Sequence, residues 1–353
     1  MDKYFATQAT NFLQKLEGIN ANTISSNPLV NDYLTSVLET KKFHLKIYAF
    51  VLQNAIETSS NKLSDISLLD FGCGNGLFAI FAKYCGIGKV YGCDIYKEFI
   101  EAATILSNTI NVAIDGWLVC NEDSLLYTCN TLQLNVIVST DAIEHIYNLN
   151  TFYANIKALN PNMVTALSTG AFYDNYFKRQ SFYKLMYNDE YVASTELHAT
   201  VKDEYAGMAY LTIRQKIIEN QFQNLTPTEI STLAKATRGL RKNDIILFVE
   251  NFLKDGKIIN VLANNLHNTC DPITGNFTER ILTTKEYTKF YTKNNFALTI
   301  KAGFYNAEGS SPKAILQKII NCFITIFKNS FLGRYVAPFI LFIGTPKLNK
   351  QPI

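Results

Sequence analysis

The sequence predicts an α/β fold built on a mainly parallel, doubly wound sheet. Apolar runs of strand length alternate with segments of helical periodicity between residues 44 and 171. Each strand–helix unit spans about 20–30 residues, as parallel strands joined by crossover helices require. The first strand leads into a turn with glycine at 72, 74 and 76. A turn of this kind lets a ligand approach the backbone closely.

The glycine turn indicates which cofactor is bound. Residues 68–76 read Leu-Leu-Asp-Phe-Gly-Cys-Gly-Asn-Gly. A dinucleotide fingerprint would need its third glycine at position 77, which is Leu77, and usually has no acid before its first glycine. The spacing instead resembles the first motif of class I S-adenosylmethionine-dependent methyltransferases. In that family the turn lies against the amino-acid and ribose parts of the cofactor.

The resemblance extends to the next two strands. Lys89 to Asp94 is a short strand that ends in an acid, where a carboxylate can accept hydrogen bonds from both ribose hydroxyls. The resemblance places Asp123 at the adenine amino group, with Ser124 beside it. A helix N-cap for Asp94 and a loop acid for Asp123 are the competing interpretations. The resemblance therefore implies S-adenosyl-L-methionine as cofactor, bound by Asp70, Gly72, Gly74, Gly76, Asp94, Ile95, Asp123, Ser124 and Thr140.

The fourth strand, Leu134 to Thr140, is followed by a polar run that contains Asp141, Glu144 and His145. This run resembles the ubiquinone-biosynthesis O-methyltransferases. We predict that His145 is a catalytic base, because histidine titrates near neutral pH and this position often reaches the acceptor. A surface histidine, or a ring packed over the cofactor, is the alternative. On one helical turn the three side chains would share a face that suits Mg²⁺, but acids are common at helix starts. We therefore predict no metal site.

The resemblance covers residues 44–171 well and residues 283–347 more loosely. The later range is predicted to supply a sixth strand, residues 295–301, and an antiparallel seventh strand, residues 337–344. The complete prediction is thus a Rossmann-like, seven-stranded methyltransferase sheet with a helical insertion after the fifth strand. Residues 1–43 are predicted to form an N-terminal helical extension that also covers the cofactor.

Residues 172–282 interrupt this core. They are too long for a simple connection and too apolar for a disordered linker. An insertion after the fifth strand reaches the carboxyl ends of the strands, where ligands bind in open α/β sheets. We therefore expect a helical lid that forms the acceptor pocket. Its return loop carries a second catalytic candidate, His267, and two substrate-binding candidates, Glu279 and Arg280, although structural capping explains such residues equally well.

Composition narrows the class of protein further. The chain has 33 basic and 30 acidic residues, and the basic residues are scattered, so nucleic acid is not an expected partner. No Cys-x-x-Cys pair and no signal peptide are visible, which favours a cytoplasmic setting. No uncharged apolar run is long enough for a membrane span. The amphipathic segment from Ala314 to Phe331 is expected to pack on the sheet rather than on a membrane surface.

These observations predict an enzyme that methylates a small molecule, at a hydroxyl oxygen. N- or C-methylation of a small metabolite and a non-catalytic cofactor-binding role are the alternatives. The sequence leaves the acceptor, the pathway and the oligomeric state open.

Overall fold

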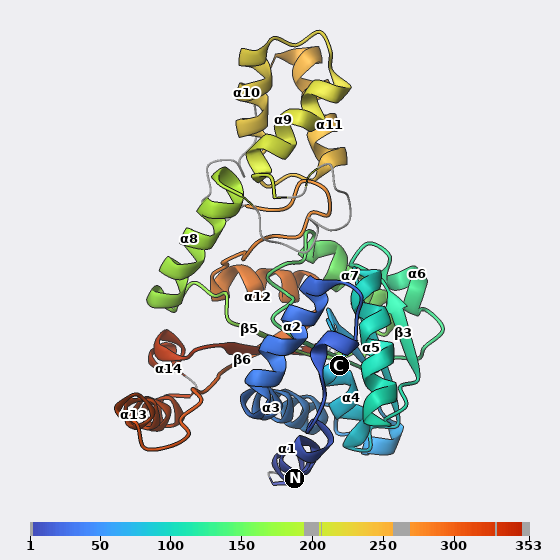
Figure 1. Cartoon of the computed structure of the whole chain (residues 1–353), viewed down its shortest axis with the longest axis vertical. Coiled ribbons are helices and arrows are strands. Elements are labelled where there is room, and N and C mark those ends of the chain that lie inside the picture. Colours follow the sequence, from blue (N-terminus) through green and yellow to red (C-terminus); the bar gives the residue numbers. More distant parts are fainter. Residues whose placement is uncertain (1–2, 194–204, 206, 257–268, 329, 348–353) are drawn as a thin grey trace, which may run out of the picture. The chain divides into compact units, whose positions relative to one another are not determined.

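A computed structural model describes residues 3–193, 205, 207–256, 269–328 and 330–347 (Figure 1). The chain folds into two compact units. Unit 1 comprises the residues up to Ile143, then Asn148–Gly170, then the residues from Thr284 onward. Unit 2 comprises Glu144–Tyr147 and Ala171–Thr283.

Unit 1 is built around a seven-stranded sheet in the order β3-β2-β1-β4-β5-β7-β6. The first five strands run parallel, and β7 is antiparallel to both of its neighbours, β5 and β6. This confirms the predicted sheet, including its antiparallel seventh strand. The strands are β1 (Ser67–Phe71), β2 (Lys89–Asp94), β3 (Gly116–Val119), β4 (Val136–Thr140), β5 (Val164–Thr169), β6 (Phe296–Ala302) and β7 (Ile340–Pro346).

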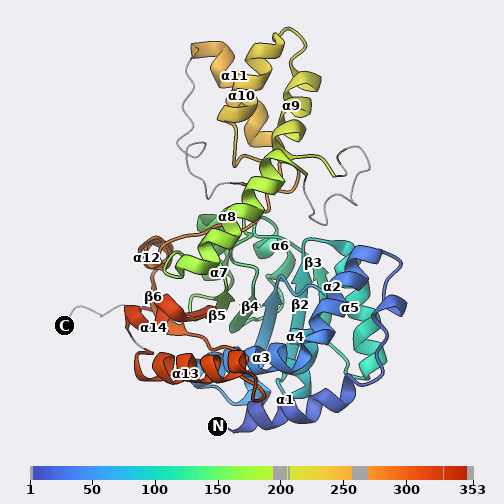
Figure 2. The ribbon, with the colours of Figure 1, turned by 60° about the vertical axis from the view of Figure 1, so that its left-hand side comes forward.

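Helices cover both faces of this sheet (Figures 1 and 2). One layer contains α3, α4 and α5, with α1 and α2 packed outside it, and the other contains α6, α7 and α12. The central strands β1 and β5 are consequently buried along their whole length, as a doubly covered sheet requires. The helices are α1 (Tyr4–Lys15), α2 (Pro28–Glu39), α3 (Lys41–Ser59), α4 (Leu77–Tyr84), α5 (Lys97–Ile110), α6 (Leu125–Cys129), α7 (Leu149–Leu159), α12 (Thr284–Lys293), α13 (Pro312–Ile326) and α14 (Phe331–Val336).

The strand order determines where a ligand can bind in unit 1. The chain moves from β1 outward to β2 and β3, then crosses back to β4 on the other side of β1. The connections therefore diverge between β1 and β4, at the carboxyl ends of the strands. Open α/β sheets bind ligands at such a switch point. The glycine turn after β1 and the polar run after β4 both begin at this edge.

Unit 2 has a helical core of its own. Its described residues include the helices α8 to α11, and a buried apolar cluster that contains Tyr210, Ile213 and Ile245 joins α9, α10 and α11. A capping box begins the helix at Pro227, because the Thr226 and Glu229 side chains each accept a hydrogen bond from the other residue's backbone N–H. The helices are α8 (Tyr176–Tyr191), α9 (Tyr210–Gln221), α10 (Pro227–Ala236) and α11 (Lys242–Asp255).

A buried ion pair joins two helices of unit 2. The Arg214 guanidinium donates to both carboxylate oxygens of Glu190, and its Nε donates to the Ala234 carbonyl at 2.8 Å. Both charged side chains are almost completely buried. Charges withdrawn from water need this degree of pairing, since a single buried charge is strongly destabilising.

Two expectations about local structure are wrong. The run from Asp141 to Ile146 is a turn and not a helix, because Asp141 has a φ of +50° and leaves the helical region. The carbonyls of Glu144 and His145 instead accept hydrogen bonds from the backbone of residues 280 and 277. Helix α13 does not pack its apolar face on the sheet; most of that face is exposed. No helix in the described ranges combines the length and the hydropathy needed to cross a bilayer.

Candidate active site

The three glycines of the turn serve different purposes. All three have positive φ values, which favour glycine. A Cβ on Gly72 would lie 2.5 Å from the Ala142 Cβ, and one on Gly76 would lie 2.3 Å from the Trp117 ring. Internal packing therefore excludes a side chain at these two positions. At Gly74 the three nearest atoms all belong to the Tyr33 side chain, at 3.1–3.4 Å. Of the three glycines, Gly74 is thus the one whose nearest neighbour is the end of a long side chain, which can move to let a cofactor approach the backbone.

Asp94 holds this turn in place. Its Oδ2 accepts from the Gly74 N–H at 2.9 Å, and its Oδ1 accepts from the Tyr96 N–H at 3.0 Å. A carboxylate oxygen can accept more than one hydrogen bond. The same residue can therefore shape the turn and accept from ligand hydroxyls. This geometry fits the ribose of the implied cofactor.

Asp70 lies below the turn, almost completely buried. Its Oδ2 accepts from the Ala79 N–H at 3.1 Å, which ties the end of β1 to the first turn of α4. Burial raises the pKa of the Asp70 carboxyl to about 8, while the bond from Ala79 opposes that rise.

Residues of α2 and α3 join the site, although the motifs did not single them out. Tyr33 is 47% exposed, yet its hydroxyl end lies over Gly74. Burial of that end, together with the Asp141, Asp94 and Asp70 carboxylates, raises the pKa of the Tyr33 hydroxyl. His44 also faces Asp141, but burial prevails and lowers the pKa of its imidazole. The sequence predicted that an N-terminal helical extension covers the cofactor, but no motif identified these two side chains.

The remaining predicted cofactor residues lie after the neighbouring strands. Ile95 follows β2, and Thr140 is the last residue of β4; both are half-buried. Asp123 is exposed, whereas Ser124 is half-buried. The Ser124 hydroxyl and N–H both bond Asn121, at 3.0–3.1 Å. These bonds shape the turn after β3, and the assignment of Asp123 and Ser124 to adenine stays a prediction.

A second polar group lies within unit 2, where two distant segments pair. The backbone N–H of Phe277 donates to the His145 carbonyl at 3.1 Å, and that of Arg280 donates to the Glu144 carbonyl at 3.2 Å. The Arg280 guanidinium also donates to the carbonyls of Ile146 and Tyr147 and lies over the Phe277 ring. Hydrogen bonds from Phe277 and Arg280 thus stabilise the turn at residues 144–147.

This pairing brings together Glu144, His145 and Glu279. Each offers one ligand atom, and these atoms lie within 4.8 Å of one another. The Nδ1 of His145 lies 2.7 Å from the Phe277 carbonyl, which can only accept, so we assign the ring proton to Nδ1. The neutral ring then carries its lone pair on Nε2. The group has the chemistry of a proton acceptor beside two carboxylates, or of a divalent cation site.

Arg280 has a structural task in this arrangement. It is 9% exposed, and its guanidinium donates hydrogen bonds to two backbone carbonyls. The Asp271 carboxylate accepts hydrogen bonds from the backbone N–H groups of Ile273 and Thr274 and so stabilises a turn. His267 lies outside the described residues.

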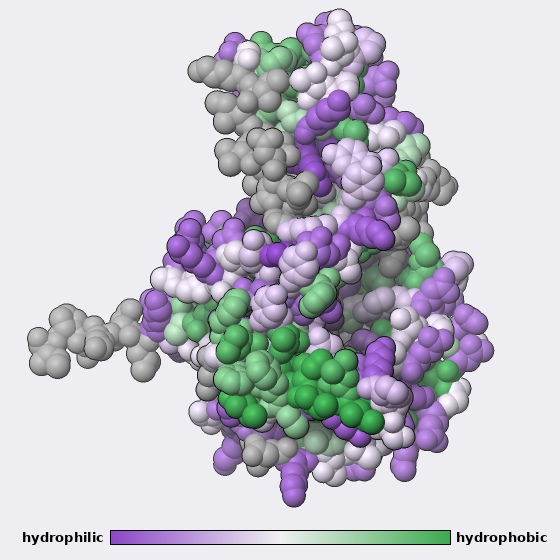
Figure 3. Space-filling model, turned by 90° about the vertical axis from the view of Figure 1, so that its left-hand side faces the viewer, coloured by the Kyte–Doolittle hydropathy of each residue, from purple (hydrophilic) through white to green (hydrophobic). Residues whose placement is uncertain are grey.

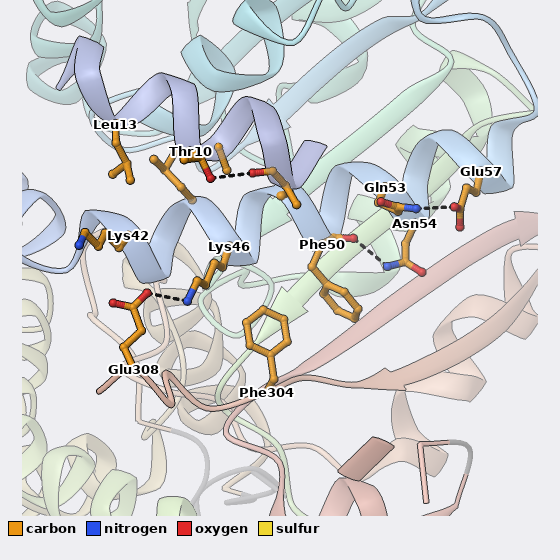
Figure 4. Close-up of a pocket in the computed structure, with 14 residues that line it drawn as sticks. Thr10, Leu13, Lys42, Lys46, Phe50, Gln53, Asn54, Glu57, Phe304 and Glu308 are labelled. Carbon is orange, nitrogen blue, oxygen red and sulfur yellow. Dashed lines mark hydrogen bonds and ion pairs between the residues drawn. The ribbon is translucent and has the colours of Figure 1, made fainter. Parts of the chain in front are cut away.

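A cavity of about 700 Å³ in unit 1 is separate from the glycine turn. Side chains of α1 and α3 line it, with Phe304 and Glu308 on the opposite side, and an ion pair of 2.6 Å joins Lys46 to Glu308 (Figure 4). None of its lining residues belongs to the turn or to the candidate catalytic groups. The cavity is therefore not the candidate active site.

Comparisons with known proteins identify the kind of domain that the first half of the chain resembles. Residues 44–204 match a family model described as a methyltransferase domain. The ubiquinone biosynthesis O-methyltransferase of Rickettsia prowazekii is 28% identical over 127 residues, which are 36% of this chain and 48% of that protein. Ribosomal protein L11 methyltransferase of Burkholderia mallei is 54% identical over 37 residues, 10% of this chain and 12% of that protein.

Among solved structures, an S-adenosylmethionine-dependent methyltransferase from Mesorhizobium loti is 11% identical and aligns over 84% of this chain and 97% of its own. Its TM-score is 0.37, which is too low to support an argument. The chain spans about half the length of the ubiquinone-pathway relatives that it matches.

Proposed function

Because the chain carries a class I S-adenosylmethionine-dependent methyltransferase domain, we propose that it methylates a small-molecule acceptor at a hydroxyl oxygen. The observation that carries the proposal is the glycine turn, which Asp94 holds at the switch point of the sheet. The matched Rickettsia proteins are named as O-methyltransferases, and this favours oxygen as the acceptor atom.

S-adenosylmethionine supplies an activated methyl group when bound, so the protein has to align an acceptor, exclude water and remove a proton. Gly74 and Asp94 would hold the amino-acid and ribose parts, with Tyr33 as a cover over the turn. His145 would take the acceptor's proton at Nε2, because its Nδ1–H is engaged with the Phe277 carbonyl. Its neighbour Glu144 would favour the imidazolium formed in that step.

Residues 172–282 would then choose the acceptor. The core motifs are occupied with the cofactor and leave little chemistry for discrimination. Glu279 stands with His145 in one polar group, and Arg280 keeps that group in shape. We therefore propose that Glu279 contacts the substrate and that Arg280 positions this group. His267 stays a second catalytic candidate.

Two measurements test the proposal. Calorimetry with S-adenosylhomocysteine reports whether the cofactor binds; absence of binding would refute the proposal. Incubation of the chain and labelled S-adenosylmethionine with a metabolite extract would then reveal the product by its mass. A methylated hydroxyl supports oxygen as the acceptor, and a methylated amine or carbon redirects the proposal to the N- or C-transfer alternative. Cofactor binding without turnover would indicate a non-catalytic protein.

Label that appears in protein rather than in small molecules would point to a macromolecular acceptor. The L11 match concerns an enzyme named for a protein acceptor, but it covers only 10% of this chain. It therefore supports the cofactor-binding part and not the choice of acceptor.

A further inference from the structure

Helix α13 presents an apolar stripe to solvent. Its exposed apolar residues recur at three- and four-residue spacing, which places them on one side of the helix. Ile319 is 62% exposed and Ile326 is 75% exposed. A stripe of this size on a water-facing side is unusual, because amphipathic helices normally turn that side inward. The stripe consists of Ile315, Leu316, Ile319, Phe323 and Ile326.

Specific hydrogen bonds hold the helix in this orientation. The Asn321 side chain accepts from the Tyr305 N–H at 2.8 Å and donates to the Tyr305 carbonyl at 2.9 Å. The side of α13 that carries Asn321 therefore faces the protein, and Ile324 on that side lies beside Ala302 and Ala337 in a small buried cluster. Rotating the apolar stripe inward would break both bonds. The exposed stripe is thus a built feature of the fold.

Helix α14 enlarges the apolar surface. Phe331, Leu332 and Tyr335 are each 41–54% exposed, and α14 packs against α13. Figure 3 shows hydrophobic side chains gathered on the face of unit 1 that carries these two helices. We call the exposed apolar residues of α13 and α14 the α13–α14 face.

The segment that forms this face carries charges of a single sign. From Gly309 to Lys347 the sequence contains no aspartate or glutamate, whereas the chain as a whole is nearly balanced. The same stretch contains Lys313, Lys318, Lys328 and Arg334. Basic side chains beside exposed aliphatic and aromatic ones match an anionic lipid surface. The apolar and the basic side chains would each contribute to binding at such a surface.

We propose that the α13–α14 face docks on the surface of an anionic lipid bilayer. α13 contains 15 residues, fewer than the roughly 20 that a spanning helix needs, so it lies in the interface plane. Aromatic residues such as Phe323 and Tyr335 suit the headgroup boundary. The proposal does not depend on the methyl-transfer reaction, because it uses none of the residues of the candidate active site.

The unaltered chain offers a direct test. Cys322 on α13 is exposed, whereas Cys73 is half-buried and the other cysteines are buried, so a thiol-reactive, environment-sensitive fluorophore labels Cys322 preferentially. Vesicles of phosphatidylcholine with phosphatidylglycerol should shift its emission to the blue. A Cys322→Ser, Ile105→Cys variant carries the label on α5 instead and should show no shift.

Vesicle sedimentation measures the same interaction without a label. Ile319→Glu should weaken binding to anionic vesicles at least about tenfold, because it places a charge in the stripe. Ile105→Glu is the matched control; it changes an isoleucine of 44% exposure on α5 and should leave binding unchanged. Lys313→Gln with Lys328→Gln should weaken binding to anionic vesicles several-fold and reduce its salt dependence, since Lys318 and Arg334 remain. Thermal unfolding of each variant separates lost docking from lost folding.

Three results would overturn the proposal. The first is no binding of the unaltered chain to anionic vesicles. The second is equal binding by the Ile319→Glu and unaltered chains. The third is self-association of the unaltered chain in sedimentation velocity that Ile319→Glu abolishes, which would assign the face to a second copy.

Discussion

The glycine turn of unit 1 and the 144–147 turn of unit 2 are held by different kinds of contact. The glycine turn depends on neighbours from the same strand–helix units, since Asp94 bonds Gly74 across two adjacent strands. The turn at 144–147 depends on residues 277–280, more than 130 residues later in the chain. The first can be recognised as a short motif, whereas the second exists only when a long insertion returns to it. The comparison suggests that cofactor binding and proton transfer can be disrupted separately.

Gly74→Val should have the largest effect, on the cofactor side alone. Valine would strain a backbone at φ +50° and fill the space next to Tyr33, so S-adenosylhomocysteine binding should be lost in calorimetry. Gly309→Val is the matched control, because Gly309 has φ +84° and no atom within 4 Å of a Cβ. Binding retained by a folded Gly74→Val chain would place the cofactor elsewhere.

His145→Gln should affect turnover and not binding. Loss of a positioned base typically costs about 10²–10⁴ in rate, while the cofactor affinity should stay within a factor of about two. The acid limb of the pH–rate profile should disappear with it. His44→Gln tests the competing histidine near Asp141. A larger loss of turnover in His44→Gln would move the base to unit 1.

Asp94→Asn sharpens the comparison, since Asp94 serves both the turn and the ligand. The asparagine side chain has one acceptor oxygen where aspartate has two, so the variant loses one charge-assisted hydrogen bond, worth about 1.5–3 kcal/mol. We expect cofactor affinity to fall roughly 10- to 100-fold, measured by calorimetry. Asp123→Asn, at an exposed acid, tests the predicted adenine contact by the same measurement. An unchanged affinity for Asp94→Asn would remove this residue from the site.

Tyr33→Ala should weaken cofactor binding about two- to tenfold, the range expected for one packed aromatic ring. Tyr33 contacts Phe99 edge-on and covers Gly74, so its ring matters more than its hydroxyl. Tyr33→Phe should therefore bind almost as well as the unaltered chain. Equal losses in both variants would assign the effect to the hydroxyl and its neighbouring carboxylates.

Asp70→Asn should have the smallest effect, visible in the pH dependence of stability. Because the pKa of Asp70 is raised to about 8, the folded chain keeps a proton that the unfolded chain releases above about pH 4. This group therefore lowers the free energy of unfolding as pH rises from about 4 to about 8. Denaturant unfolding of Asp70→Asn across that window should show a weaker decline. An identical decline would mean that Asp70 is ionised in the folded chain.

Helices α12 and α13 show how far periodicity alone can be trusted. Both are amphipathic segments beside the late strands. α12 buries Tyr287 and Tyr291, which pack near Phe342 of β7. α13 has the more apolar sequence but leaves its stripe exposed, because Asn321 is anchored to Tyr305. Periodicity identified the apolar side of α13, and long-range partners decided which way that side faces.

The sequence by itself determined the succession of strands and helices in the core and the residues of the glycine turn. Each strand–helix unit is a local pattern, and parallel crossovers leave few ways to combine such units. Only the tertiary structure placed Tyr33 over Gly74 and brought Glu279 to Glu144 and His145. These contacts join residues that are far apart in the chain, and no local spacing encodes them. They depend instead on loop closure and on burial, which are properties of the folded chain as a whole.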